Sequence, residues 1–143
     1  MSGCGMTGAH FHSIDAKGRT NFPAKLREAL GESFWLVRGT KDRYLSVYSQ
    51  EKWEKIHADL TAIPGNGGEQ LKRWLNAGAF EVTPDKQGRI LIPQNLRDYG
   101  YLDKDIAIIG AGDKVEIWEK NRWTAQDEAF DPTSIPQLED LCL

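Results

Sequence analysis

Two short basic segments contain residue types that can bind phosphate groups and the edges of bases. Lys17 and Arg19 lie in the sequence DAKGR, and Lys86 and Arg89 lie in the sequence DKQGR. The planar guanidinium of Arg can bond two acceptors at once, such as O6 and N7 of guanine, whereas the compact charge of Lys suits backbone phosphate. The chemistry that these residues predict is binding to double-stranded DNA, with the arginines as the more specific contacts.

Each basic segment also contains an aspartate and a glycine, which together predict a tight turn. Asp15 and Asp85 can accept hydrogen bonds from nearby backbone, while Gly18 and Gly88 can adopt a positive φ. We expect these four residues to orient the loop. The aspartates are not expected to bind DNA themselves, because phosphate repels a carboxylate. A plainer interpretation, in which each aspartate only pairs with its arginine to fix the turn, is compatible with this role.

Two further arginines recur a fixed distance after the turns. Arg27 and Arg97 lie beside a leucine in the short helical patterns PAKLREAL and PQNLRDY, and both are candidate phosphate contacts. The alternative is a solvated or salt-bridged position, which is common for an arginine on a helix. The other basic residues of this region have no basic counterpart in the second half: Lys25, Arg38, Lys41 and Arg43.

These residues recur because the chain contains an internal repeat with an offset of 70 residues and no gap. Identical pairs are Asp15 with Asp85, Gly18 with Gly88, Arg19 with Arg89, Pro23 with Pro93, Leu26 with Leu96, Arg27 with Arg97 and Trp53 with Trp123. We therefore divide the chain into a first repeat, a helical connector, a second repeat, and a C-terminal helix with an acidic tail. The corresponding residues are 9–52, 53–78, 79–122 and 123–143.

Each repeat predicts the same unit, in which a hairpin, a short helix, a second hairpin and a longer helix follow one another. Pro23 and Pro93 suit the first position of the short helices, and Gly31 and Gly100 suit their ends. Predicted strands are 9–14, 19–22, 34–38 and 44–49 in the first repeat, and 80–83, 89–92, 106–110 and 115–119 in the second. Predicted helices are 23–30, 69–79, 93–99 and two segments that contain Trp53 and Trp123.

Four short strands in one repeat would leave exposed edges and too little apolar surface for independent stability. We therefore expect the two repeats to pair into a single closed sheet, a barrel with pseudo-twofold symmetry and peripheral helices. The fold class that this predicts is α+β, mainly β.

The segments DAKGRTNFPAKLR and DKQGRILIPQNLR resemble the SpoVT-AbrB family, and their tandem arrangement is similar to the MraZ family of bacterial transcriptional regulators. The resemblance covers about residues 8–123. It implies a swapped-hairpin barrel within one chain, a ring-shaped homo-oligomer, and binding to repeated promoter elements of a division and cell-wall gene cluster that the protein represses. The D-x-x-x-R motif of the family corresponds here to Asp15 with Arg19 and to Asp85 with Arg89.

The charge distribution agrees with this expectation better than the total charge does. The net charge is −3, which by itself argues against binding to nucleic acid. Residues 12–43, however, contain seven basic against four acidic residues, whereas residues 124–143 contain five acidic residues and no basic one. The sequence also contains no long apolar segment and no signal-peptide pattern, so we expect a cytoplasmic, nucleoid-associated protein.

Other functional classes have weaker support. The acidic tail suits an antitoxin-like module that binds a partner protein, and we rank this second. An enzyme on a related barrel ranks third, since self-cleavage there needs a Gly-Ser bond that this chain lacks. We expect no cofactor, no small-molecule substrate and no metal, because His10, His12 and Cys4 would be three loosely placed ligands without a fourth. Cys4 and Cys142 are expected to be free thiols.

Overall fold

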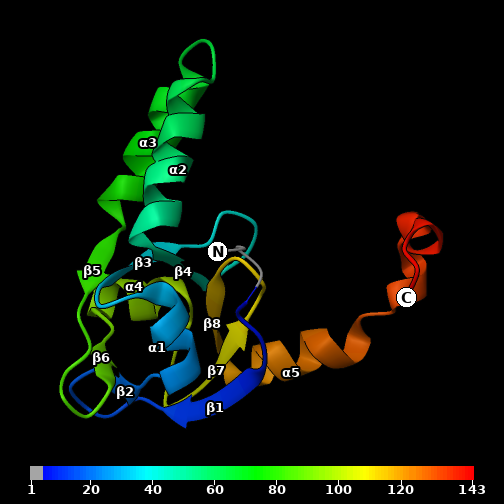
Figure 1. Cartoon of the computed structure of the whole chain (residues 1–143). Coiled ribbons are helices and arrows are strands. Elements are labelled where there is room, and N and C mark those ends of the chain that lie inside the picture. Colours follow the sequence, from blue (N-terminus) through cyan, green and yellow to red (C-terminus); the bar gives the residue numbers. More distant parts are fainter. Residues whose placement is uncertain (1–4) are drawn as a thin grey trace.

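Each half of the chain folds into the same order of elements, which confirms the repeat that the sequence indicates (Figure 1). The computed structural model describes residues 5–143. The first half consists of β1 (Ala9–Ser13), β2 (Arg19–Asn21), α1 (Ala24–Leu30), β3 (Phe34–Arg38), β4 (Leu45–Ser49) and α2 (Gln50–Thr61). After α3 (Gly67–Ala77), the second half consists of β5 (Phe80–Val82), β6 (Arg89–Leu91), α4 (Gln94–Tyr99), β7 (Asp105–Gly110), β8 (Val115–Glu119) and α5 (Lys120–Ala129).

The short helices α1 and α4 begin one residue later than the sequence predicts. Pro23 and Pro93 are the N-cap residues, with ψ of 133° and 153°, and not the first helical residues. Their carbonyl oxygens accept hydrogen bonds from the backbone N–H groups of Arg27 and Arg97, both at 3.0 Å. The absent N–H of proline is tolerated at either position, so the sequence could not distinguish them. Gly31, with φ of 101°, ends α1 as expected.

Six strands form one antiparallel sheet in the order β1-β7-β8-β4-β3-β5. The order is symmetric about the pair β8 and β4, which places equivalent strands of the two repeats at equivalent positions. Each edge strand pairs with the other half of the chain: Ala9 of β1 lies opposite Ile109 of β7, and Val82 of β5 lies opposite Phe34 of β3. The two repeats therefore share one sheet.

The expectation of a single closed sheet is wrong for the described residues 5–143, because the ladder ends at β1 and β5 and the strands β2 and β6 form a separate two-stranded ribbon. β2 and β6 have only three residues each. After the turn that follows β1 or β5, the chain does not pair back with that strand but enters the ribbon. Side chains, rather than hydrogen bonds, join the ribbon to the large sheet. Thr20 and Ile90 at its centre are each 2% exposed, and Ile90 packs into the main core with Phe22 and Ile92, the residues that follow the two strands.

Apolar side chains cover both faces of the large sheet. The main core lies between one face, the ribbon, α1 and α4, and it includes Leu26, Leu36, Ile90, Leu96 and Ile117. A second cluster attaches the helical pair α2 and α3 to the other face, and a third contains Trp118 with Trp123 at the start of α5. The main core thus holds the ribbon at a fixed position against one face of the sheet.

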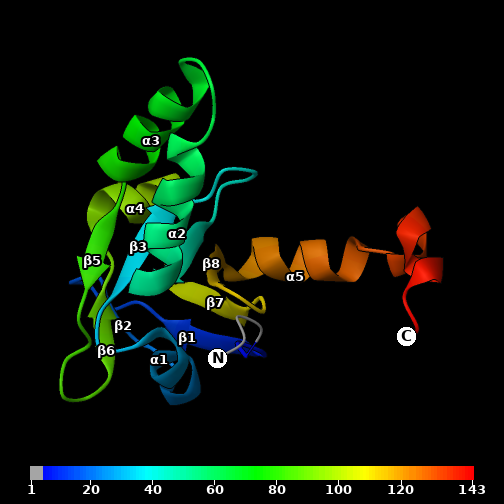
Figure 2. The same cartoon turned by 45° about the horizontal axis from the view of Figure 1, so that its top comes forward.

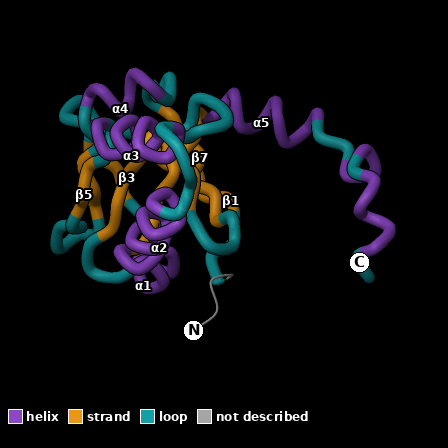
Figure 3. The backbone as a smooth tube through the Cα atoms, turned by 90° about the horizontal axis from the view of Figure 1, so that it is seen from above, coloured by secondary structure: helices purple, strands orange, loops and turns teal. Residues whose placement is uncertain are grey.

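The helical pair and the C-terminal segment extend from the sheet in different directions (Figures 1 and 2). Seen from above, α5 and the short turns after it leave the body and end far from it (Figure 3). No residue of α5 is buried, and Phe130 directly after it is 57% exposed. Of the helices that the structure describes, none is long and apolar enough to cross a membrane.

Candidate nucleic-acid interface

The two predicted turns have nearly identical hydrogen bonds. Oδ1 of Asp15 accepts from the backbone N–H groups of Lys17 and Arg19, each at 2.9 Å. Oδ1 of Asp85 likewise accepts from Gln87 and Arg89 at 2.9 Å. The backbone closes each turn too, since the N–H of each aspartate donates to the carbonyl of the arginine four residues later at 2.9 Å. These hydrogen bonds hold the backbone of both turns, while the role of the aspartates in orienting the loops for DNA stays a prediction.

Gly18 and Gly88 are required at these turns for two reasons. Their φ angles of +89° and +78° lie in the left-handed region that favours glycine. Both are also closely packed: a Cβ on Gly18 would lie 2.9 Å from the backbone carbonyl oxygen of Ile92, and one on Gly88 would lie 2.8 Å from the guanidinium of Arg27, which would have to move. Each turn thus packs tightly against the other repeat.

Both arginines of the D-x-x-x-R motif lie on the outer side of the ribbon. In the antiparallel pair of β2 and β6, Arg19 lies opposite Leu91, and Asn21 lies opposite Arg89. Because side chains alternate along a strand, these four residues share one side, while Thr20 and Ile90 point into the core. We call this outer side the ribbon face and define it as Arg19, Asn21, Arg89 and Leu91.

The two arginines of the ribbon face differ in their local partners. Nε of Arg89 donates to Oδ2 of Asp85 at 2.9 Å, and the two side chains are 40% and 38% exposed. Among residues 5–143, no ion pair is found for the guanidinium of Arg19. Backbone hydrogen bonds, first of all from the N–H of the arginine four residues later, lower the pKa of Asp15 and of Asp85 from its usual value. Both carboxylates therefore keep their negative charge well into the acidic range.

The other arginine pair connects the two repeats. Nε of Arg27 donates to the carbonyl of Phe22 at 3.0 Å, and Nε of Arg97 donates to that of Ile92 at 2.9 Å. Each guanidinium then lies against the glycine of the turn in the opposite repeat, Arg27 at Gly88 and Arg97 at Gly18. These contacts give both arginines a structural role that the sequence did not predict, beside the phosphate contact and the solvated or salt-bridged position that it left open.

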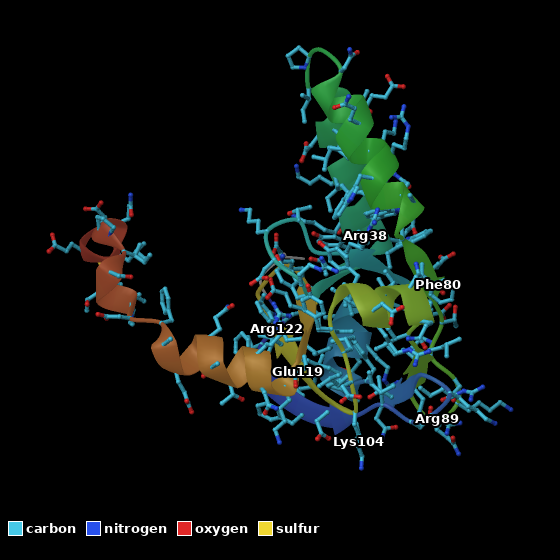
Figure 4. All side chains as sticks on the ribbon, turned by 180° about the vertical axis from the view of Figure 1, so that it is seen from behind. Arg38, Phe80, Arg89, Lys104, Glu119 and Arg122 are labelled. Carbon is cyan, nitrogen blue, oxygen red and sulfur yellow. The ribbon has the colours of Figure 1, made fainter. Side chains whose placement is uncertain are left out.

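Lys17 and Lys86 are exposed at the turns that flank the ribbon face. Arg89 lies on the side of the body away from α5 and the acidic tail (Figure 4). The arrangement therefore presents guanidinium and ammonium groups on a rigid outer surface, distant from the most acidic part of the chain. Such a surface can bind the phosphates and base edges of a nucleic acid.

Sequence reasoning missed Asn21 and Leu91, although both are exposed on the ribbon face. The sequence did contain a signal for them. Each lies two residues after an arginine on a predicted strand, and side chains two residues apart on a strand point to the same side. Conversely, two basic residues of the first repeat pack on aromatic rings elsewhere, with the guanidinium of Arg38 4.1 Å from the ring centre of Trp74 and that of Arg43 4.3 Å from that of Tyr99.

The described residues contain no group of His, Cys, Asp and Glu side chains that could hold a metal ion. Burial and the neighbouring charge of His10 lower the pKa of His12. Cys142 is a free, exposed thiol, and Cys4 lies outside the described residues. Neither the histidine pair nor the cysteine adds chemistry to the ribbon face.

Comparisons with known proteins agree with the duplicated architecture. A family model described as "MraZ protein, putative antitoxin-like" matches residues 6–68 and 75–139, which is nearly all of the chain. A protein of Acetivibrio thermocellus is 46% identical over 134 residues, which cover 91% of this chain and 93% of that protein. A protein of Lachnoclostridium phytofermentans is 49% identical over 117 residues, covering 81% and 82%, and one of Heliobacterium modesticaldum is 44% identical over 128 residues, covering 88% and 89%. All three are named "Transcriptional regulator MraZ".

Proposed function

Because the chain belongs to the MraZ family, we propose that it is a transcriptional regulator that binds double-stranded DNA in a sequence-specific manner. The ribbon face is the contact surface in this proposal. Arg19 and Arg89 bind base edges, Lys17 and Lys86 bind phosphates, and the aspartates and glycines of the turns hold these side chains in place.

The observation that carries the proposal is the placement of both motif arginines on one outer side of a two-stranded ribbon whose other side is buried. The major groove of B-form DNA is wide enough to admit a two-stranded β-ribbon. A ribbon that is fixed by core packing enters the groove without losing much conformational freedom, which favours affinity.

Arg27 and Arg97 remain part of the proposal as phosphate contacts. Their Nε atoms donate to backbone carbonyls, which leaves terminal guanidinium nitrogens that can reach a phosphate beside each turn. Because the same residues pack against the opposite turn, their loss would affect both the fold and DNA binding, and the two effects have to be measured separately.

A single subunit with a net charge of −3 would bind DNA weakly, so the proposal includes assembly into a ring-shaped homo-oligomer. Several ribbon faces on one ring can then bind repeated promoter boxes, and linked contacts raise affinity by roughly 10² to 10⁴ when the spacing matches. The protein would act in the cytoplasm at the nucleoid and repress its own division and cell-wall gene cluster. The proposal retains the repeats at 9–52 and 79–122, the connector 53–78 and the tail segment 123–143. The pairing of β1 and β5 with opposite halves supports the swapped-hairpin interpretation.

The proposal is tested with the purified full chain and a duplex containing the promoter region upstream of its own gene. Arg19→Ala and Arg89→Ala are each expected to weaken binding in gel-shift assays by about fivefold or more, because a good bidentate contact to a base discriminates by about 1–3 kcal/mol. Arg73→Ala on α3 is the matched control, since it removes the same charge from an exposed position on the helical pair. The affinity of the double Arg19 and Arg89 variant should fall further.

Two results would contradict the proposal. One is unchanged binding by the double variant when circular dichroism and sedimentation show an intact assembly. The other is binding to a single promoter box as strong as binding to the full array, which would remove the role of multiplicity.

A second candidate function, an antitoxin-like module that binds a partner protein, is favoured by the exposed apolar residues of the C-terminal segment. Phe130 is 57% exposed and Leu141 58% exposed, on a segment that extends away from the body. Removal of residues 130–143 distinguishes the two candidates: DNA binding should persist if the ribbon face is the functional surface, whereas a partner interaction would be lost.

A further inference from the structure

We infer that Asn21 and Leu91 give the two halves of the ribbon face different base preferences, so that one subunit reads a sequence without twofold symmetry. This inference rests on the proposed DNA-binding function and deepens it by naming the residues that set specificity. It concerns two positions that the motif D-x-x-x-R does not include.

The two positions are equivalent in the repeat but not in chemistry. An offset of 70 residues relates Arg19 to Arg89 and Asn21 to Leu91. Thr20 pairs with Ile90 at the centre of the ribbon, so the pseudo-twofold axis passes through this pair. The arginines obey the symmetry, whereas the asparagine and the leucine break it.

The register places each arginine beside a different neighbour. Arg19 lies directly opposite Leu91, and Arg89 lies directly opposite Asn21. Residues that are directly opposite in an antiparallel pair have Cβ atoms about 4.5–5.5 Å apart, which is close enough for both side chains to contact neighbouring base pairs. One half of the ribbon face is therefore a guanidinium beside an amide, and the other is a guanidinium beside a branched apolar group.

Neither residue is used by the fold itself. The side-chain amide of Asn21 has no hydrogen-bond partner among residues 5–143, and Asn21 is exposed. Leu91 is 41% exposed, although its neighbours in sequence Ile90 and Ile92 are buried in the main core. A leucine exposed beside two arginines contributes little to the core, but it offers an apolar surface to a ligand.

The chemistry of the two side chains selects different bases in the major groove. The amide of asparagine can bond N6 and N7 of adenine, whereas an apolar side chain can contact the methyl group of thymine. The half with Asn21 and Arg89 should therefore discriminate in favour of adenine near the guanine that Arg89 binds. The half with Leu91 and Arg19 should favour thymine near the guanine that Arg19 binds.

The arginines themselves add to this difference. Arg89 is oriented by its ion pair with Asp85, while no ion pair is found for Arg19 in the part of the chain that the structure describes. An oriented guanidinium holds a fixed geometry toward base edges, so the half with Arg89 should be the more selective one.

The test uses selection from a library of duplexes with a randomised central region. The wild-type protein is compared with Asn21→Leu, Leu91→Asn and Leu71→Asn, the last being the matched control because Leu71 is an exposed leucine on α3. Wild type should enrich a motif whose two halves differ. Asn21→Leu should lower the preference for adenine at one position by about 5- to 150-fold, the range that one bidentate contact supplies.

Leu91→Asn should give both halves of the selected motif the same preferred base, adenine, beside the guanine, whereas the control variant should select the wild-type motif. Asn21→Ala repeats the first change without adding apolar surface, which guards against a folding defect in Asn21→Leu. Selection of the wild-type motif by all ribbon variants would overturn the inference while leaving the proposed function intact. If wild type enriched no sequence at all, the proposed function and the inference would fail together.

Discussion

Replacing single glycines by alanine separates the two reasons why the turns need glycine. Gly18, Gly88 and Gly65 all have positive φ, of +89°, +78° and +80°. They differ in what a new Cβ would meet: the backbone carbonyl of Ile92 for Gly18, the end of the Arg27 side chain for Gly88, and open space for Gly65. The three variants therefore share backbone strain and differ in packing.

The magnitudes follow from these surroundings. A left-handed conformation costs a residue with a Cβ about 1–2 kcal/mol, and the reduced entropy of the unfolded chain returns about 0.4–1 kcal/mol, so Gly65→Ala should cost about 1 kcal/mol. Gly88→Ala adds the displacement of a flexible guanidinium, at the lower end of the cost of overpacking, and should cost about 2 kcal/mol in total. Gly18→Ala forces apart two backbone segments at a contact of 2.9 Å, and overpacking of this kind adds about 1–3 kcal/mol, which gives roughly 2–4 kcal/mol in total, with the upper part expected because a backbone carbonyl cannot move aside easily.

The assay is urea unfolding followed by far-ultraviolet circular dichroism, at one protein concentration because assembly contributes to apparent stability. The free energy of unfolding should fall in the order Gly65→Ala, Gly88→Ala, Gly18→Ala, with Gly18→Ala losing most. Equal losses for all three variants would refute the packing argument, since only the shared φ strain would then matter. A smaller loss for Gly18→Ala than for Gly88→Ala would show that the turn of the first repeat is not held against Ile92.

Three further predictions concern the residues around the ribbon. Arg27→Ala and Arg97→Ala should each lower the free energy of unfolding by about 1–2 kcal/mol, because both connect the repeats; thermal unfolding with unchanged midpoints would contradict this. The pKa of Asp15 and of Asp85 is lower in the folded than in the unfolded protein, so their contribution to stability is complete above about pH 4 and is lost at lower pH. Unfolding of Asp15→Asn and Asp85→Asn at a series of pH values should show a weaker loss of stability in acid than unfolding of the wild type. The pKa of His12 is lowered by burial, so its protonation favours the unfolded state and stability should fall as the pH drops below about 6.5; an imidazole titration at or above this value, followed by NMR, would refute it.

The elements of the fold could be predicted because their signals are local. The alternation in FWLVR and VEIWE, the Asp and Gly of each turn, and the spacing of Trp53, Ile56 and Leu60 each specify one element. The offset of 70 residues then correctly predicted that both halves contain the same order of strands and helices. These signals depend on residues within about ten positions of each other.

The parts that failed or were missed depend on contacts between the halves. Closure of the sheet could not be judged from the sequence. It depends on whether β2 and β6 pair with the edge strands or with each other, and this is decided by contacts between the two halves. The contact of Arg27 with Gly88 joins residues 61 positions apart, and no sequence pattern marks it. The exposure of Asn21 and Leu91 follows from burial of Thr20 and Ile90 on the other side of the ribbon, which only the packed structure provides.

The pairing of β1 with β7 has a consequence for how the chain reaches its native state. Ala9 must find Ile109, so the first strand made on the ribosome has no partner until nearly the whole polypeptide has emerged. Such distant pairing slows folding, and neither half should be a stable unit alone. A nick in the loop between α2 and α3 would cut the backbone but leave every strand pair intact, so two separately produced halves should recover the native sheet only when mixed.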